Sequence, residues 1–228
     1  MQFLDQPLDI SEEPTERLRK IQTGLTASLQ AVRPLPGFPL LLLACGLATV
    51  PLVGAGAAVL GTVGWSALSV EQRIVIFASI PTAAVLLAIS AIRQIVPGSR
   101  HTWPPAALLF AVAGGLFLAM VAAFRIQAES AFVSNSLVFL QGALTYSVPA
   151  GVLIWAVLRR GAALTPNLIG ATAGALAGLV GFAVREMNCP NLNLLHILAS
   201  HWSVALIGSV TGTVIAAGRK CLWVSEAR

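Results

Sequence analysis

The sequence predicts an all-α polytopic membrane protein: a bundle of six transmembrane helices with a short amphipathic N-terminal cytoplasmic helix. Of the 228 residues, 57% are hydrophobic and only 10% are charged, whereas soluble domains carry about 25% charged residues. The apolar residues also gather into six runs, each near the roughly 20 residues that a helix needs to cross the hydrocarbon of a bilayer. A water-soluble core cannot absorb this much apolar chain, and the length leaves no room for a second globular domain.

Residues 1–37 are predicted to form a cytoplasmic tail that contains one amphipathic helix. Ser11, followed by two glutamates and Pro14, is typical of a helix start. Apolar residues then recur at steps of three and four, which places them on one helical face: Leu18, Ile21, Leu25, Leu29 and Val32. Such a face fits a partner protein, the bilayer surface or the protein's own loops, and the sequence leaves these three readings open.

Residues 38–218 are predicted to form the transmembrane domain, and residues 219–228 a cytoplasmic C-terminal tail. Backbone groups in hydrocarbon must be paired within their own segment, so each apolar run is predicted to be a helix. The fifth run is the shortest and is rich in glycine and alanine. With these bounds no span contains Asp or Glu, which weakens an ion-coupled transporter reading. The predicted spans are 38–60, 74–96, 104–124, 136–158, 167–184 and 195–218.

The basic residues predict that both termini lie in the cytoplasm, because Lys and Arg beside a span are retained on that side. With the N-terminus inside, eleven of the 14 basic residues are cytoplasmic and only Arg73, Arg125 and Arg185 are external. The basic residues are scattered along the chain rather than gathered in one stripe. Direct binding to nucleic acid is therefore not expected.

Small residues in the last two spans predict close helix packing. Gly170, Gly174 and Gly178 follow one another at four-residue steps in the fifth span, and Gly208 and Gly212 do so in the sixth. Small residues on one face let two helix backbones approach closely. Packing within the bundle is favoured, and a homo-oligomer built on the same face is the alternative.

The densest polar cluster is predicted to be an external loop over residues 185–193, followed by two histidines at the start of the sixth span. Cys189, His196 and His201 are the candidate signal-sensing residues, because a thiol and two imidazoles suit soft or borderline metals and an exposed thiol is oxidisable. However, five positions separate the histidines, or about 140° around a regular helix. They are not expected to face one ion unless the helix begins between them, so no metal or other cofactor is predicted.

Four short strings, in their order and spacing within the six spans, resemble a known bacterial family. The N-terminal tail matches in length and character more than in letters, and the resemblance covers about residues 31 to 220. The chain is similar to NrsF-type proteins, which are six-span inner-membrane negative regulators of extracytoplasmic-function sigma factors. The strings are AVRPLP at 31–36, PGSR at 97–100, LRRGAALTP at 158–166, and NCPNLN at 188–193 with His196 and His201-Trp202.

This resemblance implies a membrane-bound anti-sigma factor that holds its sigma factor until redox or metal stress in the envelope releases it. It assigns sigma binding to the apolar face of the tail, at Leu18, Ile21, Leu25 and Leu29, and signal sensing to Cys189. Family members often carry a second external cysteine between the third and fourth spans, but residues 125–136 contain none here. Cys189 is therefore expected to act as a lone thiol, and no intramolecular disulfide switch is expected.

Two other functions remain open from the sequence. A small multi-span transporter or permease-like subunit would line a path with Gln141, Tyr146 and His201. A membrane enzyme would use Cys189, His196 and His201, but no known catalytic motif occurs in the chain, so an enzyme is not expected.

Overall fold

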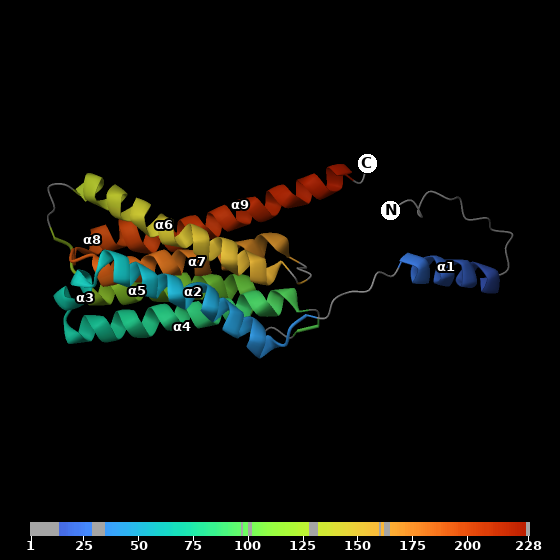
Figure 1. Cartoon of the computed structure of the whole chain (residues 1–228), viewed down its shortest axis with the longest axis horizontal. Coiled ribbons are helices and arrows are strands. Elements are labelled where there is room, and N and C mark those ends of the chain that lie inside the picture. Colours follow the sequence, from blue (N-terminus) through green and yellow to red (C-terminus); the bar gives the residue numbers. More distant parts are fainter. Residues whose placement is uncertain are drawn as a thin grey trace.

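The computed structural model of the chain describes residues 14–28, 35–96, 98–99, 102–127, 132–159, 161 and 165–226. Within this part of the chain six helices are long and apolar enough to cross a membrane. They lie side by side as one bundle (Figure 1), which confirms the predicted all-α polytopic architecture. The elements in chain order are α1 (Pro14–Ser28), α2 (Phe38–Leu60), α3 (Val63–Ala67), α4 (Val70–Ile95), α5 (Pro105–Ala123), α6 (Phe132–Leu158), α7 (Pro166–Asn188), α8 (Leu194–Ile197), the π-helix η1 (Leu198–Trp202) and α9 (Ser203–Glu226).

The helix bounds agree with the predicted spans to within a few residues. The second span begins at Val70 rather than at residue 74, because Ser69 accepts a hydrogen bond from the backbone N–H of Gln72 while the Gln72 side chain accepts one from the Ser69 backbone. This reciprocal capping box extends the helix by one turn. The sixth span comprises α8, η1 and the first part of α9, and α9 continues in helical form past the predicted end at residue 218 to Glu226.

Helix α7 is the central element of the bundle. In its most apolar stretch 67% of the residues are buried, against 17–39% in the other five spans. It packs against α2, α4, α6 and α9, so the span that looked shortest in the sequence is a full crossing surrounded by the others. Its many Gly and Ala residues follow from this position, because small side chains let four neighbours approach one helix.

Helices α7 and α9 pack closely against each other, and this packing depends on glycine. A Cβ atom on Gly174 would lie 1.9 Å from the carbonyl oxygen of Gly208, and one on Gly170 would lie 2.3 Å from that of Gly212. Both contacts are with backbone atoms, which cannot move aside without moving the helix. The glycine steps therefore serve packing within the chain, as favoured from the sequence.

Candidate functional site

The polar cluster around Cys189 is built at one end of the bundle, and its first residues are helical. The prediction of a loop from residue 185 is wrong, because α7 continues through Arg185 and Glu186 to Asn188. The side chains of Arg185 and Glu186 are 8% and 3% exposed. A carboxylate thus lies inside the last turn of a span, where the sequence analysis expected none, and a charge in such a place needs a partner.

The backbone of Cys189 is fixed by the end of α7 and by α3. Its N–H donates a hydrogen bond of 2.8 Å to the carbonyl of Arg185. A Cβ on Gly64 would lie within 2.6 Å of the Cys189 carbonyl oxygen, so only glycine lets α3 pack this closely. The side-chain amide of Asn188 donates to the carbonyl of Leu60 at the end of α2. The thiol is consequently held at the end of the bundle where α2 ends, opposite the end where α2 begins.

Asn193 starts the segment that carries both histidines. Its side-chain oxygen accepts from the N–H of Leu195 and so caps α8, and its amide donates to the Gln127 carbonyl at 2.8 Å. The Leu194 N–H donates to the Arg125 carbonyl at 3.0 Å. The start of the sixth span is therefore tied to the segment that follows α5.

The π-helix η1 brings His196 and His201 to one face. A π turn closes its hydrogen bonds between residues five apart, one residue wider than an α turn. The two rings contact each other at a centroid distance of 5.6 Å. The expectation that these histidines cannot face one ion is therefore wrong, because it assumed a regular α-helix through residues that form a π turn.

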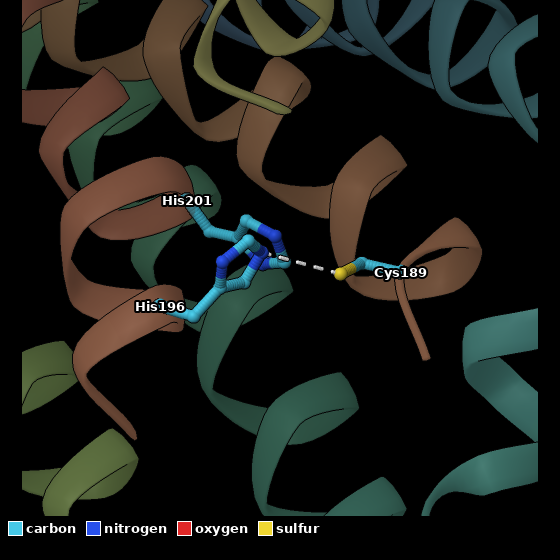
Figure 2. A group of neighbouring side chains, drawn as sticks. All are labelled: Cys189, His196 and His201. Carbon is cyan, nitrogen blue, oxygen red and sulfur yellow. Dashed lines mark hydrogen bonds between the residues drawn. The ribbon is translucent and has the colours of Figure 1, made fainter. Parts of the chain in front are cut away.

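Cys189, His196 and His201 form a compact buried cluster (Figure 2). One ligand atom from each residue lies within 4.8 Å of the other two. The Cys189 Sγ lies 3.5 Å from the Nε2 of His196. The three residues are only 4%, 0% and 1% exposed. The structure thus brings together all three candidate sensing residues, and it encloses the thiol that the sequence placed in an exposed loop.

A hydrogen bond at Nδ1 holds each of the two imidazole rings in place. The Nδ1 of His201 lies 2.8 Å from Oε1 of Glu186, and that of His196 lies 3.3 Å from Oγ of Ser136 on α6. A carboxylate only accepts, so the Nδ1 of His201 carries a proton in this contact. Its Nε2 is buried without a hydrogen-bond partner among the described residues. When the ring is neutral, with its proton on Nδ1, the Nε2 of His201 carries the lone pair that a metal ligand needs.

The surroundings of Cys189 favour its thiolate. Burial raises the pKa of the thiol, but the His196 and His201 imidazoles and the backbone at Asn191 lower it, and the resulting pKa is about 7 rather than the ordinary 9.0. A pKa near neutrality means that a large share of the sulfur is deprotonated at physiological pH. The thiolate is the form of cysteine that binds metals and reacts with electrophiles.

Aromatic rings and a cation enclose the cluster. The rings of Phe139 and His196 meet edge to face at a centroid distance of 5.1 Å, and the Arg185 guanidinium lies over the Phe139 ring, 4.9 Å from its centroid. A Cβ on Gly142 would overlap the Arg185 side chain, so this glycine makes room for it. The sequence analysis assigned no role to Glu186, Ser136 or Phe139. One signal was available for Glu186 in the sequence, because it follows the large apolar residue Phe182 by four positions and so shares its helical face.

The other predicted site residues lie elsewhere. Helix α1 stands apart from the bundle in Figure 1, with Leu18 66% and Ile21 52% exposed. Leu25 belongs to the same helix, and Leu29 lies outside the described residues. Of the residues considered for a transport path, Gln141 is exposed on α6 and Tyr146 is half-buried, whereas His201 belongs to the buried cluster.

Comparisons with models of known protein families, with curated proteins and with solved structures found no match to the chain. The relation to NrsF-type proteins thus continues to depend on the short sequence strings alone.

Proposed function

We propose that the chain is a membrane-bound anti-sigma factor of the NrsF type, which sequesters an extracytoplasmic-function sigma factor at the bacterial inner membrane. The observation that carries this proposal is the exposed apolar pair Leu18 and Ile21 on α1, a helix that stands apart from the membrane bundle. Large exposed apolar side chains on a helix are the usual anchors of helix-in-groove recognition. The sequence strings that resemble the family add the identity of the partner.

The position of α1 fits a protein that binds its partner at one end of the bundle and receives its signal at the other end. Helix α1 precedes α2, which begins at the end of the bundle opposite the Cys189 cluster. The distribution of basic residues favours a cytoplasmic location for the α1 end, where a sigma factor is available. The Cys189 end then faces the envelope, where redox or metal stress would act.

The proposal is tested by capture of the sigma factor by the full-length protein in detergent-solubilised membranes of the native host. Changing Leu18 and Ile21 to Asp should abolish capture, because each change buries a charge in the interface. Thr23→Asp is the matched control, since Thr23 lies on the opposite face of α1, and it should retain capture. If no sigma factor co-purifies with the wild type, or if the Leu18 and Ile21 variants capture as much as the control, the proposal is refuted.

Signal sensing at Cys189 is tested separately with a reporter gene that depends on the captured sigma factor. Cys189→Ser should leave the sigma factor held in unstressed cells but should abolish its release by thiol oxidants or metal salts. Cys45→Ser is the control, because Cys45 is a buried thiol in α2 outside the cluster. A Cys189→Ser strain that responds like the wild type would show that the signal enters elsewhere.

A further inference from the structure

We infer that Cys189, His196 and His201 form a binding site for one soft or borderline transition-metal ion, of the class of Zn²⁺ and Cu⁺. This inference does not depend on the proposed regulatory function, since it needs only the ligand atoms and their surroundings. It reverses the expectation from the sequence, which predicted no metal because the histidines seemed to point apart.

The spacing of the ligand atoms suits such an ion. Bonds of about 2.3 Å to sulfur and about 2.0–2.1 Å to nitrogen place neighbouring ligand atoms roughly 3.5 Å apart. The Cys189 Sγ and His196 Nε2 are already 3.5 Å apart. All three ligand atoms lie within 4.8 Å of one another, so small rotations of the side chains complete the site.

Both histidines are oriented as metal ligands. In metal sites the second ring nitrogen of a ligating histidine almost always donates to a carboxylate or another acceptor, which fixes the ring and its tautomer. Here the Nδ1 of His201 is bonded to Glu186 and that of His196 to Ser136. Each Nδ1 is thus held from outside the cluster, and the Nε2 atoms are left for the ion.

An orphaned nitrogen gives independent support. The Nε2 of His201 is buried with no hydrogen-bond partner in the part of the chain that the structure describes, although the residue is 1% exposed. Buried polar atoms are nearly always satisfied, and one that is not calls for an explanation. If the cluster served only to hold helices together, this unpaired nitrogen would destabilise the fold and nothing would offset that loss. A bound ion would satisfy it.

The chemistry of the ligand atoms selects the class of ion. A thiolate suits Cu⁺ and Zn²⁺, and imidazole suits zinc, copper, iron and nickel, whereas Mg²⁺ and Ca²⁺ require oxygen ligands. The nearest carboxylate, Glu186, is engaged by His201. The rings of Phe139 and Phe182 beside the histidines provide an apolar shell. The site therefore favours ions that bind sulfur and nitrogen.

The test uses the purified full-length protein in detergent, with Co²⁺ as a spectroscopic substitute for Zn²⁺. Wild type should bind one Co²⁺ per chain with a thiolate-to-cobalt charge-transfer absorption that Zn²⁺ abolishes on displacing the cobalt. Cu⁺ should compete in the presence of a copper chelator, and Mg²⁺ should not. Cys45→Ser should behave like wild type, Cys189→Ser should lose the charge-transfer band, and Glu186→Gln should keep the band but bind about 10–100-fold more weakly.

Two results would overturn the inference. One is a wild-type protein that elutes as a single folded species yet shows no charge-transfer band with Co²⁺ and no competition for Cu⁺. The other is a Cys189→Ser variant that retains the band. The first result does not require any variant to fold. Neither result bears on sigma-factor capture by α1, which is measured separately, so the two proposals fail independently.

Discussion

The Nδ1 of His201 lies 2.8 Å from Oε1 of Glu186, and the two side chains are 1% and 3% exposed. This contact joins the last turn of α7 to the π turn at the start of the sixth span. Neither group could be buried there alone without a large desolvation cost. Each side chain can therefore be buried at this position only because the other is its partner.

Replacing Glu186 by Ala is expected to destabilise the fold by about 3–5 kcal/mol, the usual cost of removing one partner of a buried pair. The free energy of unfolding in mixed micelles, with a denaturing detergent as the variable, measures this loss.

The control for this change is the double variant Glu186→Ala with His201→Leu. If the two side chains depend on each other, the double variant loses clearly less stability than the sum of the two single variants. Additive losses would show that the contact does not couple them.

Gly174→Ala is expected to destabilise the bundle by at least about 1–3 kcal/mol, the usual cost of overpacking. The reason is that the added methyl would overlap the Gly208 carbonyl of α9, which cannot move alone. The midpoint of thermal unfolding in detergent reports the effect.

Gly114→Ala is the matched control, because a Cβ at Gly114 in α5 meets nothing within 4 Å. It should leave stability unchanged or raise it by up to about 1 kcal/mol, since Ala suits a helix interior better than Gly. Equal effects of the two substitutions would contradict the packing assigned to α7 and α9.

Hydropathy was sufficient to predict the six spans, because in a bilayer the length of each helix is set by the hydrocarbon and its backbone must be paired internally. The errors lie at helix ends, where other forces act. The start of α4 depends on the Ser69–Gln72 capping box, and the end of α7 on the burial of Glu186 against His201. The second of these is a tertiary contact, and the spacing of Glu186 from Phe182 indicates its helical face but not its partner His201.

The candidate site was predicted by residue type but not by geometry. Cys189, His196 and His201 stood out as the residues able to bind a metal or react, and the structure brings them together. The angle between the histidines was calculated for 3.6 residues per turn, and the π turn invalidates it. Only the four helical residues Leu194–Ile197 precede the π turn, which are too few for the hydrophobic pattern to show its one-residue shift. Ser136 and Phe139 could not be predicted because they reach the site from another helix.

The topology makes a separate prediction. Alkaline phosphatase, which is active only outside the cytoplasm, should be active when fused after Gln127 and inactive when fused after Arg159. The reason is that the count of basic residues predicts that the segment after α5 is outside and the segment after α6 is inside. Activity in the reverse pattern would show that the chain has the opposite orientation, in which α1 cannot reach a cytoplasmic partner.

The π turn itself is predicted to be dispensable for the geometry of the site. Deleting Ala199 would leave His196 and the former His201 four positions apart, about 40° around a regular α-helix, and would keep α9 in register with α7. This variant should fold and retain the thiolate-to-cobalt band. The control is an Ala inserted after Val204, which does not change the spacing of the two histidines. The insertion rotates Gly208 and Gly212 by about 100° away from α7, so this variant should fail to fold. A folded deletion variant without the band would show that the wider π turn, rather than a shared helical face, is what lets both imidazoles reach the ion.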